Sequence, residues 1–353
     1  MFEKISEYGH EQVLYCSNEK LGLKAIIAVH STVLGPSLGG VRMWDYKSDE
    51  DALYDVLRLS RGMSLKNAVV GLGLGGGKAV IIGDSARVKN ARMLQAFGEH
   101  IERLHGTYIT AEDVNMTTMD MAHISLGTNH VVGLEGKSGN PSPFTARGVY
   151  QGIKAASLEK FGTTDLKGVR IAVSGVGSVG YELCHLLHKD GAKLIVSDIR
   201  QLLAARAAVD FNADVVNPHE ILKCEAEIFA PCALGAVINE NNAQQIKFKM
   251  VAGAANNVLV DNRAGDIMHE REILYVPDYI INAGGVINVS FEALDIYDKT
   301  KVLEKVDGIY DTVENLLKFA KAENLPTHLA ADIFAQSIID DAQKAKNRKR
   351  RTR

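Results

Sequence analysis

The chain has 353 residues, with a hydrophobic fraction of 46% and a charged fraction of 24%, which is ordinary for a globular protein that buries a core. Its net charge of −3 gives no reason to expect nucleic acid or an anionic membrane as a partner. No signal peptide and no apolar run of the ~18 residues that a membrane span needs are visible, and the four cysteines lack metal-ligand spacing. These features predict a cytoplasmic protein of about two domains without a metal site.

The first 130 residues alternate predicted strands with predicted helices. Apolar runs predict strands at 12–16, 23–29, 79–82 and 108–110. Acidic residues and helically spaced leucines after Ser48 predict a helix that Ser48 caps, and a second helix is expected over about 88–105. The glycine-paired segment 35–40 predicts a turn.

The segment 66–78, KNAVVGLGLGGGK, contains five glycines within seven residues and passes directly into an apolar run. Because glycine is costly to order, we expect another group to approach this backbone so closely that a Cβ atom would collide with it. The segment is not a phosphate loop GxxxxGK[ST], since Leu72 and Ala79 occupy the glycine and hydroxyl positions. A lysine beside a second cation and away from water loses basicity, so Lys66 and Lys78 predict a general base at Lys78. Two ordinary surface lysines are the alternative.

A Gly-, Pro- and Ser-rich stretch at 131–143 predicts a linker, after which the strand–helix alternation begins again. Thr145 is expected to cap a helix that ends near residue 161. The following predicted strands are 169–174, 193–197, 213–216, 227–230, 251–254 and 274–276, with helices at 178–190 and 200–210. This alternation predicts a doubly wound parallel sheet. Two long helices are expected to close the chain, one over 302–317 and one that Thr327 caps.

The segment Gly175-Val-Gly-Ser-Val-Gly180 lies between a predicted strand and a predicted helix, as a dinucleotide-binding loop requires. Gly175 would permit the turn, Gly177 would admit a pyrophosphate, and Gly180 would allow close packing of helix on strand. Asp198 ends the next strand, where its carboxylate would accept from ribose hydroxyls and repel a 2′-phosphate. The motif therefore favours NAD over NADP, although Arg200 could tolerate that phosphate. A glycine-rich turn that binds no cofactor is the alternative.

Several further motifs occur in a fixed order along the chain. They are Gly39-Gly40-Val-Arg-Met, Lys66 with GLGLGGGK78, the Asp113 segment, GNPSPFTARGVY, the GxGxxG loop, APCALGAVIN at 230–239, AGAANN at 252–257 and PDYIINAGGVINV at 277–289. Together they resemble the glutamate/leucine/phenylalanine/valine dehydrogenase family over essentially the whole chain, and its leucine-specific members most. The resemblance implies an α/β enzyme with two domains around a cleft. A substrate and oligomerisation domain would comprise 1–131 and 327–353, a linker 132–141, and a Rossmann NAD-binding domain 142–326.

The resemblance also implies an activity, the oxidative deamination of an L-amino acid to its 2-oxo acid and ammonia with NAD. Lys66 would pair with the substrate carboxylate beside the backbone amides of Gly39 and Gly40. Lys78 would activate water, and Asp113 would exchange protons with the substrate nitrogen. The remaining cofactor contacts would come from Thr145, Ser178, Val179, Ile199, Cys232, Ala233, Ala254 and Asn256, with Asn282 reaching the ligands. A homo-oligomer is implied, with eight subunits as the number considered.

The substrate side chain is predicted from the position that holds a lysine in glutamate-specific relatives. Leu38 occupies it here, and an apolar residue cannot pair a buried carboxylate. Met63, Ala111, Val286 and Val289 would complete a pocket for leucine, isoleucine or valine, or they are plain core. One methylene changes binding by only ~1–3 kcal/mol, so overlap among the three is expected.

Two alternatives to the leucine-specific reading remain. The sequence Val114-Asn-Met after Asp113 is nearer to aromatic-specific relatives, which makes a phenylalanine or tryptophan dehydrogenase the first alternative. A non-catalytic NAD-binding regulator is the second.

Overall fold

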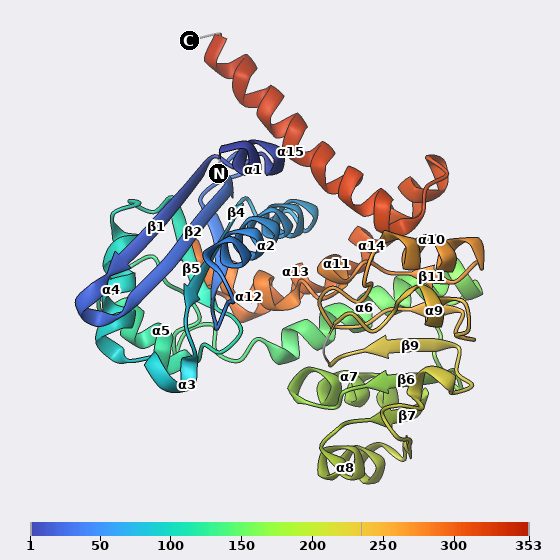
Figure 1. Ribbon diagram of the computed structural model, residues 1–353. Coiled ribbons are helices and arrows are strands. Elements are labelled where there is room, and N and C mark those ends of the chain that lie inside the picture. Colours follow the sequence, from blue (N-terminus) through green and yellow to red (C-terminus); the bar gives the residue numbers. More distant parts are fainter. Residues whose placement is uncertain (1, 234, 352–353) are drawn as a thin grey trace. The chain divides into compact units, whose positions relative to one another are not determined.

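The computed structural model describes residues 2–233 and 235–351 (Figure 1). The chain divides into two compact units, which we describe one at a time. Unit 1 comprises Met1–Asn140, Asn288–Asp298 and Ala335–Arg353, and unit 2 comprises Pro141–Ile287 and Lys299–Phe334. The segment Asn288–Asp298, which the sequence analysis assigned to the NAD-binding domain, thus clusters with unit 1, and residues 327–334 cluster with unit 2.

Unit 1 is built on a five-stranded sheet with the order β1-β2-β4-β3-β5. Its elements up to residue 140 are α1 (Phe2–Tyr8), β1 (Gln12–Asn18), the 3-10 turn η1 (Glu19–Leu21), β2 (Leu23–Ser31), β3 (Ser37–Trp44), α2 (Asp49–Val69), β4 (Gly75–Ile82), α3 (Ser85–Val88), α4 (Ala91–Glu102), β5 (Tyr108–Glu112) and α5 (Thr118–Ser125). Strands β3, β4 and β5 are parallel, whereas β2 runs antiparallel to both β1 and β4.

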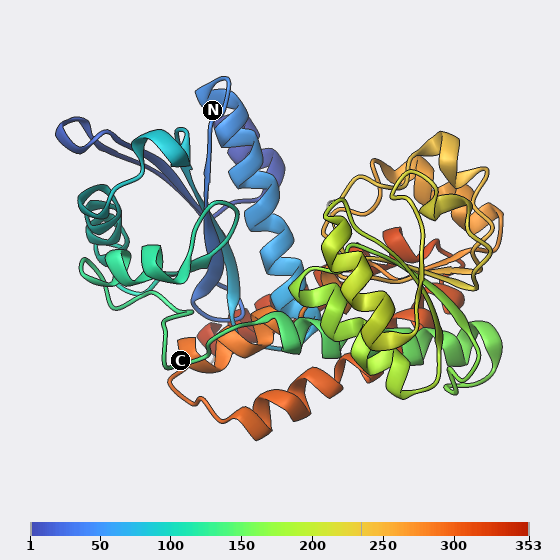
Figure 2. The same cartoon turned by 90° about the horizontal axis from the view of Figure 1, so that it is seen from below.

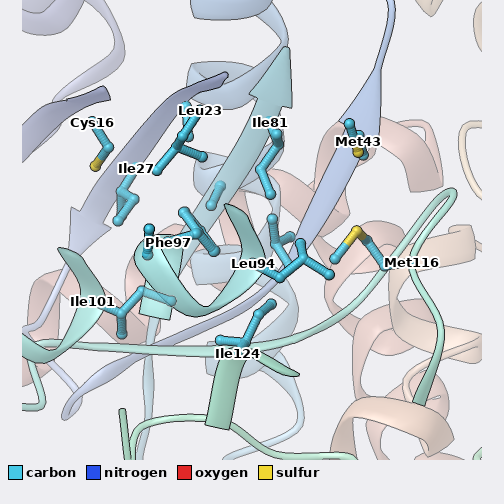
Figure 3. Packing of buried hydrophobic residues seen from close by; sticks show 14 of the residues in the cluster. Cys16, Leu23, Ile27, Met43, Ile81, Leu94, Phe97, Ile101, Met116 and Ile124 are labelled. Carbon is cyan, nitrogen blue, oxygen red and sulfur yellow. The ribbon is translucent and has the colours of Figure 1, made fainter. Parts of the chain in front are cut away.

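Helices cover this sheet on both faces because β2 and β4 are apolar on both. Ile26 and Ala28 of β2 pack with Val56 and Leu57 of α2 on one face. On the other face Leu23 and alternate apolar residues of the central strands pack against α4 and α5, a cluster that Figure 3 shows around Phe97 and Leu94. Figure 2 shows α2 and the α4–α5 pair on opposite sides of the sheet. The cap that Ser48 was predicted to supply is present, since its Oγ accepts a hydrogen bond from the backbone N–H of Asp51.

The predicted turn at 35–40 is wrong from residue 37 onwards, because Gly39 and Gly40 lie inside strand β3. Strand β4 begins at Gly75, four residues earlier than predicted, and includes the last three glycines of the run. In both strands glycine serves close packing between elements and does not mark a loop, as the site geometry below shows. Glycine composition alone does not separate these two uses.

Unit 2 contains a six-stranded sheet with the order β11-β10-β9-β6-β7-β8, in which every pair is parallel. Numbered along the chain from β6, this is the order 3-2-1-4-5-6 of dinucleotide-binding folds, so the predicted doubly wound sheet is confirmed. The strands are β6 (Arg170–Ser174), β7 (Lys193–Ser197), β8 (Asp214–Val215), β9 (Ile228–Pro231), β10 (Met250–Val251) and β11 (Leu274–Tyr275).

The helices from residue 141 onwards are α6 (Ser142–Phe161), α7 (Ser178–Lys189), α8 (Gln201–Phe211), the 3-10 turn η2 (Ile221–Lys223), α9 (Glu240–Ala243), α10 (Asn262–Glu270), α11 (Asp278–Ile281), α12 (Gly284–Ala293), α13 (Lys299–Asp307), α14 (Ile309–Ala322) and α15 (Thr327–Arg351). Helices α12 and α15 each contribute residues to both units. Two predictions are corrected. Gly308 divides the long helix predicted over 302–317 into α13 and α14, and α6 begins before Thr145, whose hydroxyl donates to the carbonyl of Pro141 in the first turn. None of the helices within 2–233 and 235–351 is long and apolar enough to cross a membrane.

Candidate functional site

The centre of the candidate site in unit 1 is a carboxylate held by two cations. Asp113 follows directly after β5, and its Oδ2 lies 2.8 Å from Nζ of Lys78 on β4. The same oxygen accepts a hydrogen bond from Nε of Arg42 on β3 at 3.1 Å. Only 6% of Lys78 is exposed, so the pair is shielded from water more than a surface ion pair would be.

Burial by itself raises the pKa of the Asp113 carboxyl, but the attraction of Lys78 and then of Arg42 outweighs it, and the pKa lies below its ordinary value. Asp113 is therefore an anion near neutral pH. Lys78 was predicted as a base from the second lysine alone, without this carboxylate, with which Lys78 forms an ion pair.

Gly40 makes the contact between Lys78 and Asp113 sterically feasible. Strand β3 lies between β4 and β5, and its Gly40 pairs with Ala111 of β5. On the other side of β3, Val41 pairs with Ala79 of β4, so Gly40 lies at the level of Lys78, the residue before Ala79. A Cβ atom at Gly40 would lie 2.9 Å from Cβ of Asp113 and 2.8 Å from the carbonyl oxygen of the preceding residue. Ladder pairs between β3 and β4 are also missing at Gly39 and Gly40, whose backbone was predicted to face the substrate carboxylate.

The last three glycines of the run show the close approach that was predicted, and the approaching groups are the protein's own, whereas a Cβ atom on Gly73 would meet nothing within 4 Å. A Cβ atom on Gly76 would lie 2.1 Å from the backbone nitrogen of Ser64, and one on Gly39 would lie 1.8 Å from the carbonyl oxygen of Gly77. Strand β4 is thus pressed against both α2 and β3. Neither neighbour could be accommodated if these glycines carried side chains.

Lys66 lies in the last turn of α2, on the segment that meets β4. Two residues before it Ser64 contacts Gly76, and immediately after it the fully buried amide of Asn67 donates to the carbonyl oxygens of Gly75 at 2.6 Å and Leu38 at 3.3 Å. The helix turn that carries Lys66 is therefore fixed to both strands of the candidate site.

Three of the predicted pocket residues lie on neighbouring elements of unit 1, next to Gly39 and Gly40. Leu38 is fully buried on β3, Ala111 lies opposite Gly40, and Cγ of Met63 would be 3.2 Å from a Cβ atom on Gly39. Val289 is half-buried in the part of α12 that belongs to unit 1. Val286 lies in unit 2, and its place in the pocket stays a prediction.

The predicted nucleotide loop of unit 2 has the expected form. It leads from β6 to the N-terminus of α7, which is 12 residues long and has no side-chain cap at Gly177. A Cβ atom on Gly180 would lie 1.9 Å from the carbonyl oxygen of Gly175, as close helix–strand packing requires. A Cβ atom on Gly177 would meet only a guanidinium nitrogen of Arg200 at 3.3 Å. The protein itself therefore leaves Gly177 open, as an approaching phosphate needs.

Asp198 lies just past the end of β7, and its side chain is 6% exposed. Its Oδ2 accepts from the backbone N–H of Val176 at 3.0 Å and its Oδ1 from that of Arg200 at 2.8 Å. Asp198 thus organises the glycine loop itself, a role that the spacing argument did not include. The neighbouring Ile199, a predicted cofactor contact, is 87% exposed. Ser178 and Val179 begin α7 in the same unit.

The other predicted cofactor residues of unit 2 form a second group. The amide of Asn282 donates to Oδ1 of Asn256 at 2.8 Å and to the carbonyl oxygen of Ala254 at 3.1 Å. Oγ1 of Thr145 would be 2.8 Å from a Cβ atom on Gly285, three residues after Asn282. Two more of them adjoin the glycine loop: Cys232 donates its N–H to the carbonyl of Ser174 at 2.7 Å, and Ala233 packs against Gly175.

Three residues that contact the predicted site were not predicted from the sequence. Arg42 stands in the quoted Gly-Gly-Val-Arg-Met motif, where it had no assigned role. Tyr108 is fully buried and donates to the carbonyl oxygen of Gly39 at 2.7 Å. Asn67 directly follows Lys66, and this adjacency was the only feature of the sequence that could have indicated its role. No group of three or more His, Cys, Asp or Glu side chains that could hold a metal ion occurs in 2–233 or 235–351.

Comparison with known proteins adds independent evidence. The model of the Glu/Leu/Phe/Val dehydrogenase dimerisation domain matches residues 10–130, and that of Glutamate/Leucine/Phenylalanine/Valine dehydrogenase matches residues 200–347. Leucine dehydrogenase of Geobacillus stearothermophilus is 52% identical over 350 residues, which cover 98% of this chain and 95% of that protein. L-tryptophan dehydrogenase of Nostoc punctiforme is 44% identical over 349 residues, covering 99% and 98%. A crystal structure of L-tryptophan dehydrogenase from Nostoc punctiforme matches with a TM-score of 0.87 at 41% identity, covering 97% of this chain and 99% of that one.

Proposed function

The chain belongs to the glutamate/leucine/phenylalanine/valine dehydrogenase family, and from this premise we propose that it catalyses the reversible NAD-dependent oxidative deamination of branched-chain L-amino acids, with L-leucine preferred. The amino acid, NAD⁺ and water would yield the 2-oxo acid, ammonium, NADH and a proton. The observation that carries the proposal is the ion pair between buried Lys78 and half-buried Asp113 beside Gly39 and Gly40, in a chain half identical to a leucine dehydrogenase.

Three charged side chains of the candidate site in unit 1, Lys66, Lys78 and Asp113, would take part in this chemistry. Lys66 and the backbone amides of Gly39 and Gly40 would bind the substrate carboxylate, which fixes Cα in the site. Asp113, an anion, would attract the substrate ammonium, exchange a proton with its nitrogen and stabilise the cationic imine that forms when hydride leaves Cα. Lys78 would exchange protons with the water that attacks this imine, passing between its charged and neutral forms.

The residues of unit 2 fit NAD. The amides at the N-terminus of α7 would bind the pyrophosphate beside Gly177, and Asp198 would face the adenosine ribose. Thr145, Asn256 and Asn282 would hold the nicotinamide and its carboxamide. Bound NAD supplies the hydride acceptor for the substrate Cα.

The apolar pocket supports leucine over glutamate. Leu38 is uncharged and fully buried, so a substrate carboxylate beside it would lose its hydration without gaining a counter-charge. Met63, Ala111, Val286 and Val289 would set the pocket size. The similarity to a tryptophan dehydrogenase keeps an aromatic substrate as the second candidate.

Initial rates of NADH formation with L-leucine, L-valine, L-phenylalanine, L-tryptophan and L-glutamate test the proposal. We expect the largest kcat/KM for leucine, an overlap with valine within the ~10–200-fold that one methylene allows, and no turnover of glutamate. A preference for phenylalanine or tryptophan would replace the leucine proposal with the aromatic one. Absence of NADH formation with every amino acid, together with retained NAD binding, would favour a regulator.

We further propose a cytoplasmic homo-oligomer, with eight subunits as its expected number. The match of residues 10–130 to a dimerisation domain supports self-association. Light scattering on the purified full chain would give the number of subunits, and a mass of one subunit would exclude an oligomer.

A further inference from the structure

Arg42 connects Asp113 to a second carboxylate that has no part in the proposed chemistry. Its Nε donates to Oδ2 of Asp113, and its Nη1 donates to Oδ2 of Asp55 on α2, each at 3.1 Å. Asp55 also accepts from the hydroxyl of Tyr46 at 2.7 Å and from Nη2 of Arg58 at 3.0 Å. The guanidinium plane is therefore fixed at both ends, between Asp113, which belongs to the candidate site, and Asp55 of α2, which does not.

Both cations that meet Asp113 bind the same oxygen. Lys78 and Arg42 each contact Oδ2, and no other hydrogen bond or ion pair to the Asp113 carboxylate occurs among residues 2–233 and 235–351. Oδ1 thus keeps its lone pairs available. A carboxylate with one oxygen bound by two cations presents the other in a fixed direction, as a proton acceptor or ion partner needs.

We infer that Arg42 is a positioning residue for the proposed deamination: it orients Asp113 and keeps this carboxyl ionised while the charge of Lys78 changes. The inference rests on the proposed function, in which Lys78 alternates between ammonium and amine. If Lys78 were the only counter-charge, Asp113 would lose its stabilisation each time Lys78 lost its proton.

An arginine suits this role better than a second lysine. Guanidinium does not lose its proton in proteins, and its fork can contact two carboxylates at once. Although burial lowers the pKa of Arg42, Asp113 and Asp55 raise it further, so the net change is upwards. The positive charge that Arg42 places beside the Asp113 carboxylate is consequently permanent.

The other groups around Asp113 do not supply a competing charge that titrates near neutral pH. Tyr108 of β5 is fully buried, and burial raises its pKa far above neutrality. Burial and the hydrogen bond to Asp55 likewise raise the pKa of Tyr46, which follows β3. The charged groups on the neighbouring elements are Lys78 on β4, Arg42 on β3, and Asp55 with its partner Arg58 on α2.

The test compares Arg42→Gln, Arg42→Lys and a control, Arg58→Gln, in the full-length protein. Arg58→Gln also removes one cation from Asp55, but this cation does not touch Asp113. For Arg42→Gln we expect kcat to fall by about 10- to 100-fold and the acid limb of the kcat/KM profile to move to higher pH, because Asp113 loses one of two cations. For Arg42→Lys we expect the acid limb to stay near its wild-type position, and for Arg58→Gln both quantities to stay near wild type.

Two further measurements separate the inference from the proposed function and from misfolding. Titration of the Asp113 carboxyl by ¹³C NMR, assigned with Asp113→Asn, should give a higher pKa in Arg42→Gln than in wild type whether or not the protein turns over an amino acid. NAD affinity should not change, which shows that unit 2 is folded. An unmoved Asp113 titration and an unmoved acid limb in Arg42→Gln would overturn the inference. Absence of wild-type turnover would instead overturn the proposed function.

Discussion

Replacement of Gly76 by alanine tests the packing on which the site of unit 1 depends. The new Cβ would lie 2.1 Å from the backbone nitrogen of Ser64, 2.3 Å from its Oγ and 2.4 Å from its Cα. Ordinary contacts between such atoms are about 3.5 Å, so α2 and β4 would have to separate by roughly 1.4 Å. The colliding atoms belong mainly to backbone, which cannot rotate away as a flexible side chain could.

Overpacking of this kind costs about 1–3 kcal/mol, and we expect the upper half of that range for Gly76→Ala. Alanine also restricts the backbone of the unfolded chain more than glycine does, which offsets less than 1 kcal/mol of this cost. The separation would also move Lys66 away from Lys78, and a displacement of about 1 Å costs on the order of 10²-fold in rate. Urea unfolding would give the stability, and kcat/KM for leucine oxidation would give the effect on the site.

Gly62→Ala is the matched control, because Gly62 lies in the same helix and a Cβ there would meet nothing within 4 Å. We expect this variant to be more stable by about 0.5–1 kcal/mol, the helical preference of alanine over glycine, with unchanged activity. If Gly76→Ala matched wild type in both measurements, the close contact between β4 and α2 would not be what requires the glycine.

Three further predictions follow. Lys78→Ala should lower kcat by at least ~10²-fold while the NAD dissociation constant stays unchanged, and unaltered turnover would refute its acid–base role. Asp198→Ala should raise the NADP/NAD ratio of kcat/KM by roughly tenfold or more, since a carboxylate no longer repels the 2′-phosphate; a constant ratio would contradict this. Burial lowers the pKa of His10 and of His30 to about 4, and their rings lie 4.8 Å apart. Between pH 7 and 5, these two histidines bind protons in the unfolded chain, where their pKa is ~6.5, but stay neutral in the folded chain. The free energy of unfolding should therefore fall by about 2 kcal/mol per histidine over this range. Urea titrations of wild type and of His10→Gln/His30→Gln would show this loss in wild type only.

The parallel sheet of unit 2 was predictable because its signals are local. An apolar run, three glycines at fixed spacing and an acidic residue at the end of the next strand each report on their own neighbourhood, and Gly175 and Asp198 lie where predicted. The function of Asp198 within the loop was not predictable in this way. Its bonds to backbone amides depend on how the loop folds back over β7.

The errors arose where a residue's reason lies in another element. Gly39 and Gly40 were predicted to form a turn because paired glycines are typical of turns. In the structure, glycine is required at these positions because β4 and Asp113 lie too close for a side chain. Gly308 divides the predicted long helix even though the apolar spacing continues on both sides of it. Arg42 was passed over because its two carboxylate partners lie 13 and 71 residues away. Such contacts follow from strand order, which the sequence pattern of unit 1 did not give.

Strand order also explains why the glycines of unit 1 and its charges belong to one arrangement. Neighbouring strands are about 4.8 Å apart, so β4 and β5, with β3 between them, are separated by nearly 10 Å. A lysine on β4 can meet a carboxylate beyond β5 at 2.8 Å only if the middle strand carries no side chain at that level, and Gly40 is the residue there. One position further along β3, Val41 pairs with Ala79 of β4 and with Glu112 of β5, so the sheet is continuous again at this level. The next residue, Arg42, then reaches the same carboxylate from the middle strand. In the order Gly40, Val41, Arg42, strand β3 thus lets Lys78 reach across it to Asp113 and itself supplies the second cation, Arg42.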